Sequence, residues 1–264
     1  MTLEPCIERG IDSLENFLGE FSADPKIILD RRETIYETLT RNSSDVTSGD
    51  FKSMKPKDLE LLFHEYDKVF FHGLIAMVMD YVAHAPVYFR LSRRMTSNGG
   101  KIIYKKIRSS FGKNPYIFEI VIAIDMLYQQ FQSGHGTVIV NGVLCRDRLY
   151  ALLSILEHEI IHLLEISLWG KSSCKKSRFH KMAVSIFGHT EFVHRMVTLK
   201  ERAAKEHGIK IGSEVTFRHR GQKYAGIVNR ITKRVTVLVN DVEGKLYNDG
   251  NRYQKFLLPL TELI

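Results

Sequence analysis

The longest regular pattern of hydrophobic positions lies between residues 146 and 168, where apolar side chains recur at intervals of three and four. This spacing places them along one face of an α-helix, at Leu149, Leu152, Leu153, Leu156, Ile160 and Leu163. Gly170 follows Trp169, and a glycine just beyond the last periodic position is typical of a helix C-cap. The pattern therefore predicts a long, largely buried helix over residues 146–168.

Shorter patterns predict further helices and strands on both sides of this helix. Helices are expected over most of residues 1–50 and over 57–83 and 179–187. Strands are expected over residues 87–91, 101–104, 117–124 and 137–140. The segment 117–124 fits equally well the start of a helix that ends near Gln132. Polar residues predict loops over 42–50 and 170–177.

The pattern changes after Gly208, where short β-rich runs replace the helical spacing. The runs are separated by turn residues, among them Gly221, Gly226, Gly244 and Gly250. Short strands broken in this way over about 55 residues are typical of a small SH3-like barrel of five strands or so. We therefore expect three parts in the chain: a helical N-terminal extension (1–50), a central α+β domain (51–207) and a small basic β-barrel (208–264).

Composition limits the class of protein. The chain has 264 residues, which is enough for one large and one small domain. No apolar run reaches 18 residues and the N-terminus carries acidic residues, so we expect neither a membrane span nor a signal peptide. The three cysteines, Cys6, Cys145 and Cys174, are too few and too widely spaced for a disulfide framework. A reducing, cytoplasmic location without a membrane partner is therefore expected.

Candidate chemistry lies in the predicted 146–168 helix, in the run His158-Glu159-Ile160-Ile161-His162. Residues four apart share one face of a helix, so both imidazoles can bind one metal ion. Glu159 lies beside the first imidazole, where a carboxylate can accept a proton from water at the metal. Two histidines and a glutamate in a mostly buried helix are unfavourable unless they are paired or bind metal. We therefore expect a Zn2+ site rather than two surface histidines.

A zinc site in a peptidase needs three protein ligands and one open position, so a third ligand has to come from a segment that folds back over the helix. Cys174, His180 and His189 are the candidates, although each can equally be a surface or capping residue. Glu165 lies three residues after His162 on the same face. It is a candidate for a third ligand, an outer hydrogen-bond partner or a surface carboxylate in a salt bridge.

Several segments between residues 58 and 264 carry a common likeness. They are residues 63–74, 92–96 with 99–100, 148–162, 179, 187–190, 226–230 and 236–239. As a set they resemble the SprT-like zinc metallopeptidases, a family that includes the DNA–protein crosslink protease Spartan. The last two segments resemble a barrel that is appended in some relatives. The resemblance implies an α+β fold with a zincin-like HExxH metallopeptidase domain followed by a small SH3-like β-barrel.

The resemblance also implies roles for individual residues. It assigns zinc binding to His158 and His162 and general-base catalysis to Glu159. The family usually takes its third ligand from His-Gly-x-x-(Phe or Trp) after the catalytic helix. Here Phe179 matches the aromatic residue, but Lys175 occupies the histidine position. The third-ligand candidates are therefore ranked in the order Cys174, which adjoins that position, His189 and His180.

Basic residues concentrate in two stretches of a chain whose net charge is +8. Residues 91–114 hold seven Lys and Arg and no acidic residue, and residues 209–264 hold ten against five Asp and Glu. Cations can pair with phosphates, while neighbouring aromatic rings can stack on unpaired bases. The candidate nucleic-acid contacts are Arg93, Arg94, Lys105, Lys106, Arg218, Arg220, Arg230, Lys233 and Arg234. A solvated basic face without a partner is an equal alternative.

These expectations combine into one function and two alternatives. We expect a zinc-dependent endopeptidase, associated with single-stranded or duplex DNA, that acts on DNA-bound or crosslinked proteins. This substrate class is implied by the resemblance alone. One alternative is a non-catalytic, zinc-containing module that binds DNA or a partner protein, since Lys175 replaces the expected histidine. The other alternative is a peptidase without a nucleic-acid partner.

Overall fold

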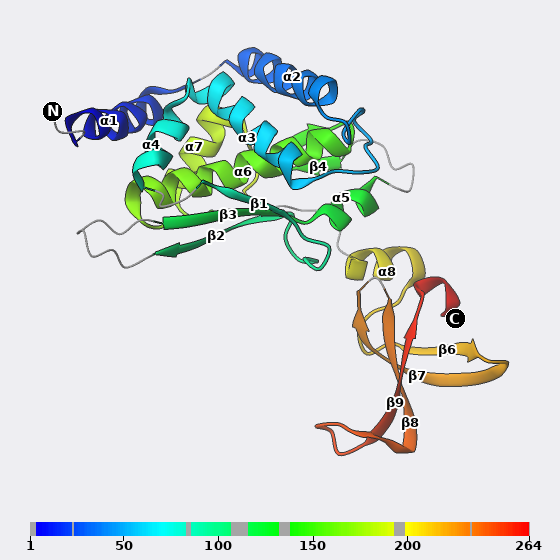
Figure 1. The fold of residues 1–264 in the computed structure, drawn as a ribbon. Coiled ribbons are helices and arrows are strands. Elements are labelled where there is room, and N and C mark those ends of the chain that lie inside the picture. The colour runs from blue at the N-terminus through cyan, green and yellow to red at the C-terminus, as the bar shows by residue number, and fades with distance from the viewer. Residues whose placement is uncertain are drawn as a thin grey trace. The chain divides into compact units, whose positions relative to one another are not determined.

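The computed structural model divides the chain into two compact units, Met1–Met196 and Val197–Ile264. It describes residues 4–22, 24–82, 86–106, 116–131, 138–192, 199–232 and 234–263 (Figure 1). The first unit contains residues 1–50 together with most of the predicted central domain, and the second begins before the predicted boundary at residue 208. Each unit has its own hydrophobic core.

The first unit combines helices with short strands. Its helices are α1 (Glu4–Glu20), α2 (Pro25–Asn42), α3 (Pro56–Phe71), α4 (Leu74–Val82), α5 (Ile124–Gln130), α6 (Arg148–Trp169) and α7 (Ser177–Phe187). Its strands are β1 (Tyr88–Leu91), β2 (Gly100–Lys106), β3 (Tyr116–Ile122), β4 (Val138–Val140) and β5 (Val143–Cys145). The predicted α+β class is therefore confirmed for this unit, and most elements lie within a few residues of their predicted ends.

Two of the less certain predictions are settled by local backbone conformation. The helical stretch 57–83 forms two helices, because His72 and Gly73 adopt positive φ angles of 55° and 85° and end α3. The ambiguous stretch that begins at residue 117 is a strand as far as Ile122 and then a short helix from Ile124. Both interpretations of that stretch are therefore correct in part.

A three-stranded sheet with the order β1-β3-β2 supports the helices of the first unit. Strand β1 is parallel to β3, whereas β2 is antiparallel to it and pairs Ile102 with Ile120. The central strand β3 is the most buried, with Phe118, Ile120 and Ile122 fully inside the core. Helices α3, α6 and α7 lie on one side of this sheet (Figure 1). Among the described residues, β2 forms an edge of the sheet.

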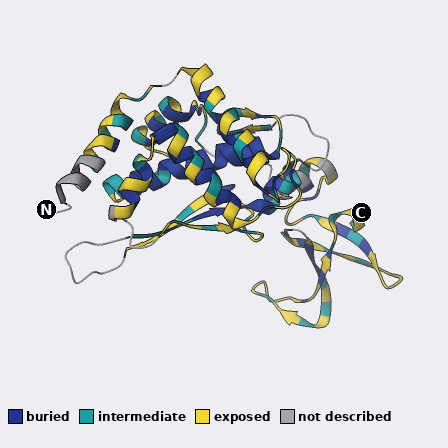
Figure 2. Cartoon of the chain, turned by 45° about the horizontal axis from the view of Figure 1, so that its top comes forward, coloured by how far each residue is buried: buried dark blue, intermediate teal, exposed yellow. Residues whose placement is uncertain are grey.

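Helix α6 runs through the middle of the first unit and carries the HExxH run. It begins after Asp147, whose side chain accepts a hydrogen bond from the backbone N–H of Tyr150 at 2.8 Å. It ends at Gly170, which has a φ of 70° and confirms the predicted C-cap. Nearly all of its residues are buried, on every side of the helix (Figure 2). The periodicity predicts a largely buried helix, and several neighbouring helices and strands contact it.

The second unit contains one helix and an antiparallel sheet. Its elements are α8 (Leu199–His207), β6 (Glu214–His219), β7 (Gln222–Ile231), β8 (Val235–Leu246), β9 (Arg252–Leu258) and a 3-10 turn (Leu260–Glu262). The sheet has the order β6-β7-β8-β9, and within residues 199–232 and 234–263 its first and last strands do not pair. The expected SH3-like barrel of five strands or so is therefore not seen among these residues, which form a four-stranded sheet. Ala203 and Ile209 instead pack on the sheet's core beside Phe217 and Phe256.

Candidate metal centre

His158 and His162 lie one turn apart on α6, and their imidazoles face each other. Their Nε2 atoms are 3.2 Å apart. Phe179, which is fully buried on α7, packs against both rings with centroid distances of 4.7 and 4.6 Å. The helix spacing therefore brings the two nitrogens together, and an apolar contact from the next helix holds the ring orientations.

Cys174 completes a set of three side chains that could hold a metal ion. It lies in the loop between α6 and α7, and the ligand atoms of Cys174, His158 and His162 are all within 4.8 Å of one another. Zinc–nitrogen distances of about 2.0–2.1 Å in a tetrahedral site place two nitrogens about 3.3 Å apart, close to the spacing of the two imidazoles. Two imidazole nitrogens and one thiolate are also donors that zinc prefers. The three residues therefore fit a zinc ion.

Glu159 lies beside this set at a cleft of about 320 Å3. Glu159 is 1% exposed, and the cleft is also lined by Gly100, Lys101, Ile102 and Tyr104 of β2. A Cβ atom at Gly100 would lie 2.7 Å from Oε1 of Glu159, which is closer than real contacts allow. Only glycine therefore permits this approach of β2 to the carboxylate.

The two lower-ranked candidates for the third ligand have other partners. His180 donates from Nε2 to the backbone oxygen of Cys174 at 2.7 Å, and its ring stacks on Phe192 at a centroid distance of 3.8 Å. His189 is fully buried, and its Nε2 donates to Oε2 of Glu157 at 2.8 Å. The structure therefore places His180 in support of the Cys174 backbone and His189 in a separate buried cluster.

This buried cluster surrounds Glu157, the residue directly before His158. Arg32 of α2 donates from Nε and Nη2 to the two carboxylate oxygens at 2.7 and 2.9 Å. Tyr66 of α3 donates its hydroxyl proton to Oε1 at 2.8 Å, and His189 completes the cluster. All four side chains are buried. The cluster therefore joins α2, α3 and the end of α7 to the helix that carries the motif.

The ionisation of the cluster follows from its burial and its charges. Burial raises the pKa of Glu157, but the positive charge of Arg32 and hydrogen bonds from His189 and Arg32 hold that pKa below its ordinary value. Burial, followed by the charge of Glu157, raises the pKa of Tyr66 well above its ordinary value. Sequence analysis missed this cluster. A charged residue next to the motif in an otherwise apolar helix was the available signal.

Glu165 was open to three interpretations, and the structure supports one of them, the outer hydrogen-bond partner. Its side chain is 1% exposed and forms an ion pair with Nε of Arg178 at 2.7 Å. It also accepts a hydrogen bond from Ser172, whose Oγ lies 2.6 Å from Nδ1 of His162. Glu165 is therefore neither a surface carboxylate nor one of the three clustered candidate ligands, but bonds to Ser172, which contacts the candidate ligand His162. Ser172 gave no signal in the sequence.

The predicted nucleic-acid contacts occur in both units. In the first unit Arg93 and Arg94 are exposed after β1, and Lys105 and Lys106 are exposed at the end of β2. In the second unit the exposed predicted cations are Arg218, Arg220, Arg230 and Arg234. Lys233 lies outside the described residues. Each unit therefore presents cations to solvent.

No family model matches the chain, and neither the curated proteins nor the solved structures give a match. The resemblance to SprT-like peptidases therefore stays a prediction that depends on the motifs. The geometry of His158, His162, Cys174 and Glu159 does not depend on that resemblance.

In the part of the chain that the structure describes, every helix lacks the length or the apolar character needed to cross a bilayer.

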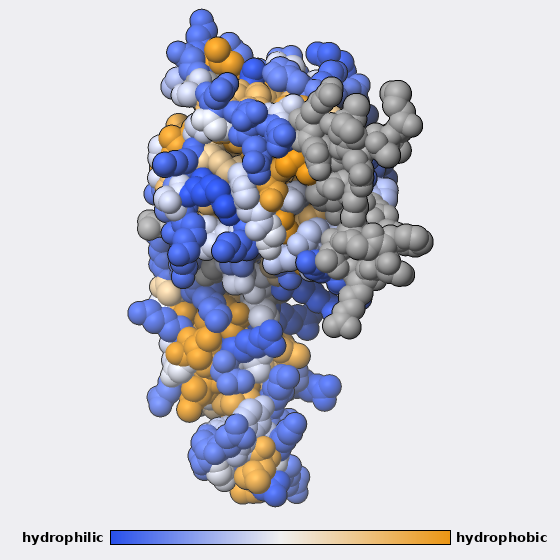
Figure 3. All heavy atoms as spheres, turned by 90° about the vertical axis from the view of Figure 1, so that its left-hand side faces the viewer, coloured by the Kyte–Doolittle hydropathy of each residue, from blue (hydrophilic) through white to orange (hydrophobic). Residues whose placement is uncertain are grey.

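On the face shown in Figure 3, hydrophobic residues lie in patches between hydrophilic ones. Large exposed hydrophobic side chains in the second unit include Ile227, Val242, Leu246 and Leu257.

Proposed function

We propose that the protein is a zinc-dependent endopeptidase of the SprT-like type. The observation that carries the proposal is the grouping of His158, His162 and Cys174 beside Glu159 at the cleft. When bound, zinc supplies a Lewis acid that polarises a peptide carbonyl and lowers the pKa of a water molecule. A nitrogen and sulfur donor set supports zinc over magnesium or calcium, which prefer oxygen ligands.

The protein's own residues supply the remaining chemistry. Glu159 accepts the proton of the attacking water and passes it to the leaving amine. His158 and His162 bind the ion as neutral imidazoles, so activity is expected to fall in acid, where protons compete for these nitrogens. Strand β2 supports binding of an extended peptide, because an exposed sheet edge can pair with the backbone of another chain.

We propose DNA-bound or crosslinked proteins as the substrate class. This part of the proposal comes from the resemblance to SprT-like peptidases. The exposed cations on both units support it, because lysine and arginine neutralise phosphates without regard to base sequence. Association with DNA would raise the local concentration of such substrates.

The test compares the wild type with Glu159→Gln in the purified full chain supplied with zinc. Cleavage of an unstructured protein, with and without single-stranded DNA, should be lost in Glu159→Gln while one zinc per chain is retained. The matched control Glu243→Gln changes an exposed carboxylate of the second unit and should cleave like the wild type.

Residual cleavage by Glu159→Gln at the wild-type rate would remove the assigned role of this carboxylate. Stoichiometric zinc in the wild type without cleavage of any protein, even on DNA, would favour the non-catalytic binding module. Cleavage that is indifferent to DNA would leave a peptidase without a nucleic-acid partner.

A further inference from the structure

Ser172, in the loop between α6 and α7, connects a metal-binding histidine to a carboxylate. Its Oγ lies 2.6 Å from Nδ1 of His162 and donates its own proton to Oε2 of Glu165. A serine hydroxyl has one proton, and an ionised carboxylate can only accept. The Ser172 oxygen therefore accepts from His162, whose Nδ1 carries the hydrogen. The lone pair then resides on Nε2, the nitrogen that faces His158.

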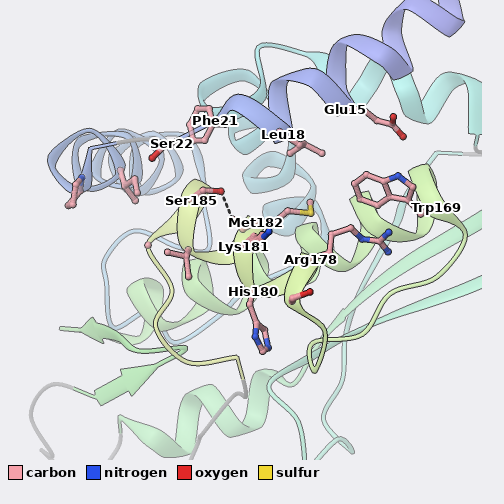
Figure 4. Close-up of a pocket in the computed structure, with 16 residues that line it drawn as sticks. Glu15, Leu18, Phe21, Ser22, Trp169, Arg178, His180, Lys181, Met182 and Ser185 are labelled. Carbon is pink, nitrogen blue, oxygen red and sulfur yellow. Dashed lines mark hydrogen bonds between the residues drawn. The ribbon is translucent and has the colours of Figure 1, made fainter.

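Glu165 is in turn held by groups from the loop and from α7. Its carboxylate accepts from the backbone N–H of Ser173 at 3.3 Å and from Nε of Arg178 at 2.7 Å. The Arg178 guanidinium lies 4.1 Å from the ring centroid of Trp169, and both side chains line a groove of about 990 Å3 (Figure 4). These contacts keep the Glu165 carboxylate directed at Ser172.

The same contacts also close the loop that presents Cys174. A purely structural clamp would act on the stability of the metal-free chain and leave the affinity for metal unchanged. A role toward the ion would act on affinity, because an imidazole that donates its other N–H to a carboxylate or hydroxyl is a stronger and better oriented ligand. A structural clamp would therefore change the stability of the metal-free chain, whereas a role toward the ion would change the affinity for metal.

We propose that Ser172, Glu165 and Arg178 are positioning residues for the metal ion. They hold His162 as the Nδ1–H tautomer and direct its Nε2 at the ion. This inference rests on the metal centre of the proposed function and does not require cleavage of a substrate. Loss of outer partners of this kind typically lowers metal affinity about 10–100-fold.

The experiment measures the affinity of the full chain for Zn2+ alone, in competition with a chromophoric chelator. Ser172→Ala should weaken binding by about 10–100-fold, and Ser172→Thr, which keeps the hydroxyl, should restore most of the affinity. The matched control is Ser173→Ala. Alanine keeps the backbone N–H that donates to Glu165, and the hydroxyl that is lost accepts from the backbone N–H of Lys175, so affinity should be unchanged.

Two further readouts separate positioning from folding. The absorption bands of bound Co2+ should shift in Ser172→Ala and return in Ser172→Thr, because the bands respond to the orientation of the ligands. The melting temperature of metal-free Ser172→Ala should lie within about 2 °C of the wild type.

Equal affinities of Ser172→Ala and Ser173→Ala would overturn the inference, as would a lower melting temperature of metal-free Ser172→Ala with unchanged affinity. A wild-type chain that binds neither Zn2+ nor Co2+ would overturn the metal centre and this inference with it. A wild type that binds Zn2+ but cleaves no protein would remove only the peptidase function, because the variant affinities would still decide the role of Ser172.

Discussion

At the scale of single residues, a thiolate donor governs the charge of the proposed centre. Two neutral imidazoles and the Cys174 thiolate would give bound Zn2+ a net charge of about +1, compared with about +2 for three histidines. A lower charge polarises a carbonyl less strongly, while sulfur increases the preference for soft metals. Phe179 packs on both imidazoles and so adds an apolar contact beside the proposed centre. Substituting one donor at a time shows how much each donor contributes to zinc binding.

The first prediction concerns the third ligand. Cys174→Ala should lower zinc affinity more than about 100-fold, beyond the usual cost of losing an outer partner, whereas Cys174→His should retain the ion. His180→Ala and His189→Ala should still bind one zinc per chain, because their ring nitrogens bond to other groups. Metal content after dialysis checks this, with the exposed His207→Ala as control. Full zinc occupancy in Cys174→Ala would contradict the assignment.

At the scale of elements, α6 is held in position from two directions. On one side its Glu157 is bound by Arg32 of α2 and Tyr66 of α3. On another side Gly100 of β2 approaches Glu159 at a distance that no side chain allows. Both contacts join residues that are far apart in the sequence. The helix therefore depends on its neighbours for its exact placement beside the cleft.

The second prediction concerns the approach of β2. Gly100→Ala would place a methyl group 2.7 Å from Oε1 of Glu159, so the strand or the carboxylate has to move. Overpacking of this kind costs about 1–3 kcal/mol of stability, and a displacement of about 1 Å at a catalytic group can lower kcat/KM about 100-fold. Peptidase kinetics and metal content check this, and zinc should be retained.

The control for that experiment is Gly19→Ala in α1, where an added Cβ meets no atom within 4 Å. It should leave kcat/KM unchanged. Wild-type kinetics in Gly100→Ala would show that the close approach has no part in the activity.

The third prediction concerns the buried ion pair. Arg32→Ala leaves Glu157 buried without its strongest cationic partner, which should lower the free energy of unfolding by about 3–5 kcal/mol. Urea denaturation of the full chain measures the change. Arg41→Ala is the control, because its pair with Glu37 is exposed and should contribute at most about 0.5 kcal/mol. A loss below about 1 kcal/mol in Arg32→Ala would contradict this account.

At the scale of the whole molecule, the chain consists of two units with separate cores. The residues of the proposed metal centre all lie within the first unit, whereas the second contributes five of the eight net positive charges through residues 209–264. If the proposed function holds, affinity for a polyanion and the chemistry of cleavage should therefore respond to different substitutions. Substitutions in the second unit should change recruitment and leave the metal centre intact.

The fourth prediction concerns salt. Binding of single-stranded DNA should weaken steeply with salt, and removal of the four cations Arg218, Arg220, Arg230 and Arg234 should reduce the slope of log K against log salt by up to about 3. Anisotropy of a labelled oligonucleotide between roughly 50 and 200 mM salt measures this. The control removes Lys26 and Arg41 of α2. Absence of binding at low salt would contradict the DNA proposal. Metal content should be the same in the wild type and in both variants.

The extent to which sequence alone could predict this molecule differs from residue to residue. The positions of His158 and His162 on one helix face follow from helix periodicity, a local property that needs no knowledge of neighbours. The partners of Glu157 could not be predicted, because Arg32 lies 125 residues away in the chain. Ser172 could not be found either, since its role depends on how the loop between α6 and α7 closes.

The sequence by itself determined the α+β class, the long helix with its Gly170 cap, and the two imidazoles that face each other. These features depend on spacing, capping and side-chain chemistry within a few residues. Only the tertiary structure decided that Cys174 approaches the imidazoles, that His180 and His189 have other partners, and that the described C-terminal strands form a sheet whose first and last strands do not pair. These features depend on contacts between distant segments, whose free energies are set by packing and burial and not by local pattern.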